Sequence, residues 1–398
     1  MLWQPPLPDR YPHMTDPELA AAITQRRREL GRNLVILGHH YQQDDVIQFA
    51  DYTGDSFKLS QLAAQRIRSV GAKYVIFCGV HFMAESADIL APEGTAVILP
   101  DLSAGCSMAD MAEYDEVVEA WDTIQQCLSA QAANRPTRMI PITYMNSTAA
   151  IKAFCGRHGG AVCTSSNCAK VLKWALAGGT RPREAQEEIK VLFLPDQHLG
   201  RNTAAALGFD LHQDMCLWDP RNAEGLGGCT PDELARSTFI LWKGHCSVHK
   251  LFRPEHVEAI RAKWPDVKVV VHPECVHEVV ARADYSASTE GILKLIEQAA
   301  PGSRWAVGTE VHMVNRLAKQ AAQRGVTVRI LSECQCLCTT MYRIDMPHLL
   351  WAMDHLVQGQ VVNQISVHPQ ARGLALQALN RMLEITAAAD IPLAATVK

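Results

Sequence analysis

The sequence contains no apolar run of the roughly 18 residues that a membrane-spanning helix needs. It also lacks a basic block of the kind that binds nucleic acid, because the short run Arg26–Leu30 is typical of a solvated helix face. The first residues, MLWQPPLPDRYPHM, do not show the basic, apolar and small order of a signal peptide. With a net charge of −4, we expect a cytoplasmic protein that takes neither nucleic acid nor membrane as a partner.

Two common phosphate-binding loops, the Walker-type lysine loop and the GxGxxG loop, are also missing. The count of 13 cysteines is high in contrast. In a large cytoplasmic chain, cysteines in polar surroundings are expected to bind metal or act in catalysis. Cys78 and Cys127 lie in apolar or helical patterns, and we expect them to be packing residues.

Short Val/Ile/Leu runs alternate with longer amphipathic stretches along the chain. This alternation predicts an α/β fold with a mainly parallel, buried sheet. Local signals place several helices. Thr15 and Glu18 form a capping-box pattern, Pro254 opens a helix that Pro265 closes, and Pro369 opens the last helix.

The strand ends form an internal repeat of three units. In each unit the first strand ends in His or Tyr, the second in Ser or Thr, the third in polar groups, and the last in Cys. Nearly the same number of residues separates His39 from Cys106 and His272 from Cys338. The middle unit is longer, and WDPRNAEGLGGCTPDELA is interpreted as an insertion.

Because ligands of open α/β sheets bind at the carboxyl ends of strands, three such units about a pseudo-threefold axis would share one central site. The alternative is that polar loops simply follow strands in any α/β protein. The predicted segments are a tail and helix at 1–32, αβα domains at 33–137, 138–252 and 253–345, and C-terminal helices at 346–398 that pack back on the core.

Three strand-like runs end in cysteines far apart in the chain, at Cys106, Cys246 and Cys338. No zinc-finger knuckle has this spacing, and three thiolates leave one coordination position of a metal centre open. The pattern favours a 4Fe-4S cluster over zinc. Cys334 and Cys336 alternate with Cys338, so zinc, copper or a redox disulfide remain alternatives for that segment.

Histidine, tyrosine and glutamate after two strands are candidates for proton transfer. His39 and Tyr41 follow an apolar strand, and His272 and Glu274 follow the matching strand of the third unit. Glu274 is expected to act as a general base if burial raises its pKa. The alternative for each histidine is a structural hydrogen bond to a loop carbonyl.

Hydroxyl side chains occupy the ends of the second strands. The residues are Ser56, Ser165, Ser288 and Thr289. Hydroxyls and N–H groups that open helices make anion sites. Ordinary helix capping is the alternative, and both roles are compatible.

Together these segments resemble the quinolinate synthase family from about Asn33 to Leu356. The resemblance depends on eleven short motifs in order. They are HxYQ to GDS (His39 to Ser56), FMAExA (Phe82 to Ala87), GCxMAD (Gly105 to Asp110), YxNS (Tyr144 to Ser147), CTSSN to Ala169, LPDxxLG (Leu194 to Gly200), WKGxCxVH (Trp242 to His249), HPEC (His272 to Cys275), DYxxST (Asp284 to Thr289), GTE (Gly308 to Glu310) and CxxM (Cys338 to Met341).

The resemblance implies three homologous αβα domains and one 4Fe-4S cluster held by Cys106, Cys246 and Cys338. It implies condensation of iminoaspartate with dihydroxyacetone phosphate to give quinolinate, phosphate and two waters. It also implies an L-aspartate oxidase as supplier of iminoaspartate and iron–sulfur assembly machinery as partners. The residues that match the family's site are His39, Tyr41, Ser56, Tyr144, Asn146, Ser165, His272, Glu274, Ser288 and Thr289.

The chain departs from the family's usual pattern at Gly38 and His40, at Thr339 and Thr340, and in the segment Trp218–Asp232, whose role the sequence does not indicate. Two other classes of function fit part of the pattern. A zinc hydrolase would use Cys and His ligands with a Glu base, and a cluster carrier would use the cysteines alone. The carrier would not need Tyr41, Glu274 and a set of hydroxyls.

Overall fold

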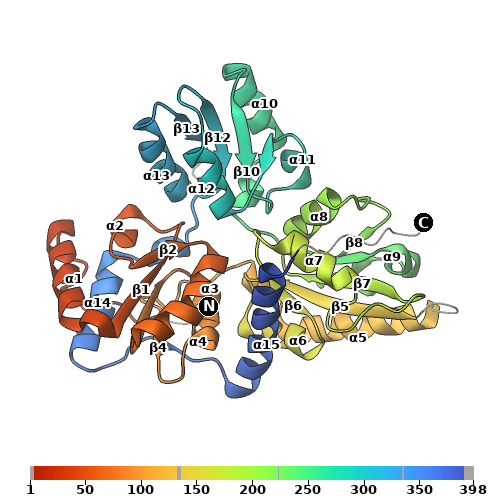
Figure 1. Ribbon diagram of the computed structural model, residues 1–398, viewed down its shortest axis with the longest axis horizontal. Helices are drawn as coiled ribbons and strands as arrows, with labels where there is room; N and C mark the ends of the chain where they lie inside the picture. Colours follow the sequence, from red (N-terminus) through yellow and green to blue (C-terminus); the bar gives the residue numbers. More distant parts are fainter. Residues whose placement is uncertain (1–3, 132–135, 223, 334–335, 390–398) are drawn as a thin grey trace. The chain divides into compact units, whose positions relative to one another are not determined.

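The computed structural model describes residues 4–131, 136–222, 224–333 and 336–389, and Figure 1 shows it as a ribbon. The described part is an α/β protein with three mostly parallel sheets flanked by helices, which confirms the predicted fold class. The chain divides into two compact units, each described by itself below. Unit 1 comprises Met1–Cys106, Glu255–Val270 and Thr289–His368, and unit 2 comprises Ser107–Pro254, Val271–Ser288 and Pro369–Lys398.

The first sheet lies in unit 1 and has five strands in the order β14-β4-β3-β1-β2. The strands are β1 (Leu34–His39), β2 (Tyr52–Gly54), β3 (Tyr74–Cys78), β4 (Ala96–Ile98) and β14 (Gln364–Ile365). β1 to β4 pair in parallel and β14 is antiparallel to β4. All six residues of β1 are buried, as expected for a central parallel strand. The helices are α1 (Asp16–Leu30), α2 (Asp44–Ile47), α3 (Ser56–Val70), α4 (His81–Leu90) and α14 (Met346–Val357).

The second sheet lies in unit 2 and has the order β6-β5-β7-β9-β8. The strands, all parallel, are β5 (Thr137–Tyr144), β6 (Ala161–Cys163), β7 (Glu188–Leu194), β8 (Met215–Trp218) and β9 (Phe239–Trp242). The helices are α5 (Tyr114–Gln131), α6 (Ala149–Arg157), α7 (Cys168–Leu176), α8 (Gln197–Ala206), α9 (Pro231–Arg236) and α15 (Pro369–Ala387). Phe193, Phe239 and Trp242 are among its fully buried side chains.

The third sheet has four strands in the order β11-β10-β12-β13. The strands are β10 (Lys268–Val271), β11 (Tyr285–Ser286), β12 (Arg304–Gly308) and β13 (Thr327–Ile330). The helices are α10 (Pro254–Lys263), α11 (His277–Val280), α12 (Thr289–Glu297) and α13 (Val311–Ala322). The 3₁₀ turns of the described chain are η1 (Gly31–Asn33), η2 (Ala109–Met111), η3 (Leu226–Gly228), η4 (His249–Leu251) and η5 (Met341–Arg343).

The same strand order recurs in all three sheets. When the edge strands β8 and β14 are left out and the remaining strands of each repeat are numbered along the chain, every sheet runs second, first, third, fourth. The predicted insertion begins at Trp218, the last residue of the edge strand β8, and contains η3 and most of α9. Gly227 has φ +57°, and a Cβ there would lie 2.4 Å from the Trp218 ring, so this turn needs glycine. The internal repeat is therefore visible as topology, and the extra length of the middle unit lies at a sheet edge.

Local signals for helix ends agree with the structure. Thr15 caps α1 with the capping box to Glu18, and α10 begins at Pro254. The last helix, α15, begins at Pro369, as expected, and ends at Ala387. The N-terminal and C-terminal segments of unit 1 meet where α1 packs on α14.

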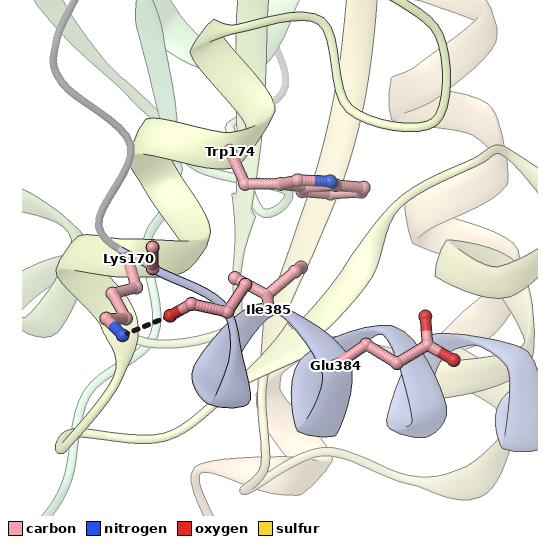
Figure 2. A pocket seen from close by; sticks show the side chains of 6 residues that line it. Lys170, Trp174, Glu384 and Ile385 are labelled. Carbon is pink, nitrogen blue, oxygen red and sulfur yellow. Dashed lines mark hydrogen bonds between the residues drawn. The ribbon is translucent and has the colours of Figure 1, made fainter.

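In unit 2, α15 packs on α6 and α7. Arg381 of α15 donates to the carbonyls of Gly156 and Gly160, at 3.2 Å and 2.7 Å, and so satisfies groups at the C-terminal end of α6. Lys170 on α7 donates to the carbonyl of Ala388 at 3.0 Å. Figure 2 shows this end of α15, where Lys170, Trp174, Glu384 and Ile385 line a cavity of about 230 Å³.

A Gly156→Ala substitution is expected to destabilise unit 2. A Cβ at Gly156 would lie 1.9 Å from the carbonyl oxygen of Leu374 on α15, so the helix must shift. Such overpacking costs about 1–3 kcal/mol, which should appear as a lower melting temperature. Gly373→Ala on α15 is the matched control, because nothing lies within 4 Å of its Cβ position. That change should leave the melting temperature equal or higher. Equal melting temperatures for Gly156→Ala and wild type would contradict the packing described.

Candidate active site

The strand order defines where polar side chains can converge. In each sheet the first and third strands are neighbours. After the first strand the chain continues to the second strand on one side of this pair, and after the third strand it continues to strands on the other side. Ligands of open α/β sheets bind at such switch points, beyond the carboxyl ends of the strands. His39 is the last residue of β1, Tyr144 is the last of β5, and His272 directly follows β10.

In unit 1, Tyr41 joins residues from the first and third repeats. Its hydroxyl lies 2.7 Å from the Thr309 hydroxyl and 3.3 Å from the Thr289 hydroxyl. The ring of His39 meets the Tyr41 ring edge-on at 4.8 Å, and the Tyr41 amide donates to His39 Nδ1 at 3.2 Å. The structure thus brings together three predicted residues and adds Thr309. Thr309 lies in the GTE motif, but nothing in that motif alone distinguished it as a site residue.

The remaining predicted hydroxyls lie at or just before helix N-termini. Ser56 is the first residue of α3, whose N-cap Asp55 accepts the Lys58 amide at 2.9 Å. Ser288 directly precedes α12, which begins at Thr289, and Ser165 lies in the turn before α7. This agrees with the expectation that these hydroxyls follow the second strands, and it keeps both anion binding and capping available.

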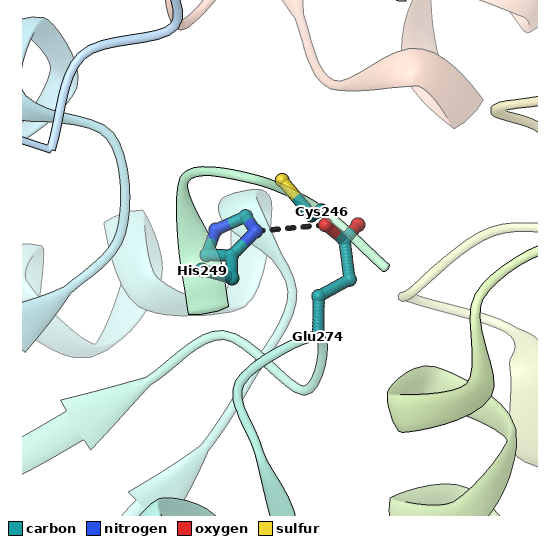
Figure 3. Close-up of side chains that lie close together, drawn as sticks. All are labelled: Cys246, His249 and Glu274. Carbon is teal, nitrogen blue, oxygen red and sulfur yellow. Dashed lines mark hydrogen bonds and ion pairs between the residues drawn. The ribbon is translucent and has the colours of Figure 1, made fainter. Parts of the chain in front are cut away.

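The clearest cluster in unit 2 surrounds Glu274. The Tyr144 hydroxyl donates to Glu274 Oε1 at 2.5 Å, and His249 Nδ1 lies 2.7 Å from Oε2. All three side chains are buried. Figure 3 shows the His249 ring facing the Glu274 carboxylate, with the Cys246 side chain beside this pair. Tyr144 and Glu274 were predicted from the sequence. His249 was not, because the motif WKGxCxVH indicated no role for its final histidine.

His272 lies beside this cluster and is a neutral imidazole at pH 7. Its ring stacks on that of His249, with centroids 4.4 Å apart. Burial lowers the pKa of His272 to about 3. The Glu274 amide donates weakly to Nδ1 at 3.4 Å, which leaves the proton on Nε2, 3.2 Å from the Ser165 hydroxyl. His272 therefore presents a hydrogen-bond donor toward Ser165.

The expectation that burial raises the pKa of Glu274 is wrong. Burial acts in that direction, but the neighbouring His249 and His272 and the hydrogen bonds from His249 and Tyr144 outweigh it and lower the pKa. Since His272 is neutral at pH 7, we attribute the lowering of the Glu274 pKa chiefly to His249, through its charge and its hydrogen bond, and to the hydrogen bond from Tyr144. Glu274 is therefore a carboxylate at neutral pH, which orients its partners and is a weaker base than expected.

Asn146 and Ser165 lie in loops of the same unit. The side-chain oxygen of Asn146 is buried and has no hydrogen-bond partner among the described residues. The loop of Ser165 is tied down by Asn167, which accepts the Thr164 amide at 2.6 Å and donates to Thr386 of α15 at 3.0 Å. A buried acceptor without a partner is costly, so a ligand donor at Asn146 would be favourable.

The three predicted ligand cysteines share a local frame. Two residues before each cysteine, a backbone carbonyl accepts a hydrogen bond from the amide of the first residue of an earlier helix, α4, α8 or α13. Three residues after each cysteine, a 3₁₀ turn begins. The bonds are His81 to Ala104 at 2.8 Å, Gln197 to Gly244 at 3.1 Å and Val311 to Cys336 at 3.1 Å, and the turns are η2, η4 and η5. Among the described cysteines, only Cys106, Cys246 and Cys338 are followed by such a turn.

Exposure also separates these cysteines from most others. Cys106, Cys246 and Cys338 are half-buried, whereas the other described cysteines are buried, apart from Cys127 on α5. Cys336 is fully buried, and Cys334 lies outside the described residues. In unit 2, Cys246 Sγ, His249 and Glu274 offer ligand atoms within 4.8 Å of one another.

None of the described helices is both long and apolar enough to span a bilayer.

The strand-end cluster and the cysteine loops define an α/β enzyme with features of a metal-binding site. The chain matches the family described as Quinolinate synthetase A protein over residues 21–384. It is 52% identical over 378 residues to a quinolinate synthase of Acidobacterium capsulatum, with 95% of each chain covered. It is 51% identical over 381 residues to that of a Nocardioides species, covering 95% of this chain and 92% of the relative. The chain therefore belongs to the quinolinate synthase family, whose members form quinolinate in NAD biosynthesis.

The buried neutral His272 predicts a specific loss of stability in acid. A pKa of about 3 in the folded chain lies below the ordinary value of 6.5, so between these pH values only the unfolded chain takes up the proton. The free energy of unfolding should therefore increase with pH across this window, by up to about 2 kcal/mol between pH 5 and pH 6.5. Glu274, with its lowered pKa, contributes only below its ordinary value of 4.5.

The measurement is the fall in melting temperature from pH 7 to pH 5. The fall should be smaller in His272→Gln than in wild type, whatever the absolute stability of the variant. His212→Gln, at an exposed position, is the control and should keep the wild-type fall. A fall in His272→Gln as large as in wild type would show that His272 is not the buried neutral group described.

Proposed function

We propose that this enzyme condenses iminoaspartate with dihydroxyacetone phosphate and releases quinolinate, phosphate and two waters. The observation that carries the proposal is the buried set Tyr144–Glu274–His249 at strand ends of a chain that belongs to this family. The reaction needs groups that hold anions and groups that move protons, and the described residues offer both. A direct assay for quinolinate from the two substrates, after anaerobic purification, tests the proposal.

We propose that Cys106, Cys246 and Cys338 hold a 4Fe-4S cluster. Support comes from their shared local frame and their half-buried thiols. When bound, such a cluster supplies an iron with an open coordination position, which acts as a Lewis acid in dehydration. A zinc site built from Cys246, His249 and Glu274 is the competing assignment, but both carboxylate oxygens of Glu274 already accept hydrogen bonds.

The substrates bring carboxylates and a phosphate, which need hydrogen-bond donors. Support for the hydroxyls as these donors is their position at helix N-termini, where amides and hydroxyls together bind anions. The proposed residues are Ser56, Ser165, Ser288 and Thr289. In unit 2, His272 Nε2–H lies beside Ser165 and adds a neutral donor, and Asn146 offers a buried acceptor for an amine or hydroxyl.

Proton transfer is assigned to two groups of residues. The Glu274 carboxylate holds the Tyr144 hydroxyl and the His249 ring in fixed orientations, and it would stabilise the imidazolium when His249 takes a proton. In unit 1, Tyr41 shares hydrogen bonds with Thr289 and Thr309 and stands beside His39. A phenol held in this way can deliver a proton to a leaving hydroxyl or carbonyl oxygen.

The chemistry of the substrates also implies partners. An imine hydrolyses in water, so an L-aspartate oxidase that produces iminoaspartate close by is the proposed supplier. Iron–sulfur assembly machinery would load the cysteines. Thiolate ligands persist in a reducing compartment, which supports the cytoplasm as the place of the reaction.

A Cys106→Ala substitution is expected to abolish both the cluster and quinolinate formation, while the chain still folds. The reason is the loss of one of three ligands. Iron and sulfide content and the broad absorption near the blue measure the cluster, and circular dichroism reports the fold. Cys127→Ala, at the other half-buried cysteine, is the matched control and should keep iron, sulfide and turnover. Wild-type iron content in Cys106→Ala would reject the ligand assignment, and colourless zinc-containing wild type would reject the cluster.

A Glu274→Gln substitution should keep the cluster but lower kcat at least about 100-fold, because His249 would lose the carboxylate that orients its ring and stabilises its imidazolium. The amide has nearly the shape of the carboxylate, yet its NH₂ group cannot accept from His249 or Tyr144. Steady-state quinolinate formation at matched iron content gives the measurement. Near-normal turnover would remove Glu274 from the reaction.

A further inference from the structure

Two fully buried acidic side chains occupy equivalent positions next to predicted ligand cysteines. Asp196 is the N-cap of α8, directly after β7 and Pro195, and Glu310 is the N-cap of α13, after β12 and Thr309. Both side chains are 0% exposed. Buried acids in equivalent places of two repeats need a reason beyond helix capping, because exposed Ser, Thr, Asn and Asp cap helices equally well.

Each carboxylate divides its oxygens between the helix and the cysteine. Asp196 accepts the Leu199 amide on Oδ1 at 2.8 Å and the Cys246 amide on Oδ2 at 3.2 Å. Glu310 accepts the His312 amide on Oε2 at 2.8 Å. Its Oε1 lies 2.9 Å from His312 Nδ1 and accepts the Cys338 amide at the longer distance of 3.5 Å. One oxygen caps the helix in each case, and the other faces the backbone N–H of the cysteine, although in Glu310 this oxygen also contacts the His312 ring.

A backbone hydrogen bond also holds each of these two cysteine loops. The residue after each acid donates its amide to the carbonyl two residues before the cysteine, Gln197 to Gly244 and Val311 to Cys336. The first repeat keeps this bond between His81 and Ala104, but its N-cap is Val80, which offers no side-chain acceptor. Two of the three repeats therefore have an acidic side chain at this N-cap position, where the first repeat has Val80.

We propose that Asp196 and Glu310 are positioning residues for the cluster ligands Cys246 and Cys338. Each carboxyl group fixes the backbone of its cysteine, so the thiolate is held in place before the cluster binds. Iron is then lost only slowly from the bound cluster. The inference rests on the proposed cluster. Partners of this kind commonly change metal affinity 10–100-fold when they are removed.

The test uses Asp196→Asn and Glu310→Gln in the full-length, cluster-loaded enzyme. Each amide keeps the shape and one acceptor oxygen for the helix cap, where Asn equals Asp, but it turns an NH₂ group toward the cysteine amide. Loss of iron to an excess of a coloured chelator should be about 10–100-fold faster than in wild type. The electron paramagnetic resonance spectrum of the reduced cluster should change as well, which a purely structural role would not require.

Asp345→Asn is the matched control. Asp345 caps α14 through the His348 amide at 2.9 Å, as the two acids cap their helices. This variant should release iron at the wild-type rate. The melting temperature of the cluster-free chains separates positioning from folding, because the amide variants should melt close to wild type without the cluster. Each acid serves a different cysteine, so one variant still tests the proposal if the other fails to fold.

The outcomes distinguish the two proposals. Wild type without iron and sulfide would overturn the proposed cluster and this inference together. Wild type with a cluster, combined with wild-type release rates and spectra in both amide variants, would overturn only the positioning role. Fast release in Asp345→Asn as well would assign the effect to helix capping and would equally overturn it.

Discussion

A buried carboxylate constrains the site in unit 2. Leaving the charge of Glu274 buried without partners would cost several kcal/mol, so its two oxygens need Tyr144 and His249. Tyr144 ends β5, Glu274 follows β10, and His249 begins the 3₁₀ turn η4 after Cys246. The hydrogen bonds to Glu274 therefore hold three separate segments together. They also connect the Cys246 loop with the residues proposed to move protons.

The three repeats share backbone geometry more closely than side chains. The amide-to-carbonyl bond that frames each cysteine uses only backbone groups, so it is compatible with Val80, Asp196 or Glu310 at the N-cap. Additions to the sheets follow the same logic. β8 pairs beside β9, and β14 pairs beside β4. Both lie at the fourth-strand edge, away from the neighbouring first and third strands whose ends carry the site residues.

Local chemistry made much of this structure predictable from the sequence. The capping box at Thr15, the prolines that open α10 and α15 and the apolar runs of the central strands each act within a few residues. Long-range partners were not predictable in this way. Tyr144 and Glu274 are 130 residues apart, so their hydrogen bond could not be read from spacing.

The error on Glu274 has the same origin. An apolar strand before a glutamate indicates burial, which raises a carboxyl pKa, but the pattern does not reveal which donors meet the carboxylate. Thr309, Asp196 and Glu310 were missed for a related reason. Their motifs were recognised, yet a buried residue gains its role from the segment it faces, here Tyr41, Cys246 and Cys338.

The polar groups of unit 2 also separate by charge across His272. On one side, Nε2–H faces the Ser165 hydroxyl near the N-terminus of α7, where an anion is favoured. On the other side lies the Glu274 carboxylate, which would repel an anion. A neutral imidazole between them donates on the first side without adding a positive charge that would pair with Glu274. This separation of charge supports the proposed role of Ser165 in anion binding and the proposed role of Tyr144 and His249 in proton transfer.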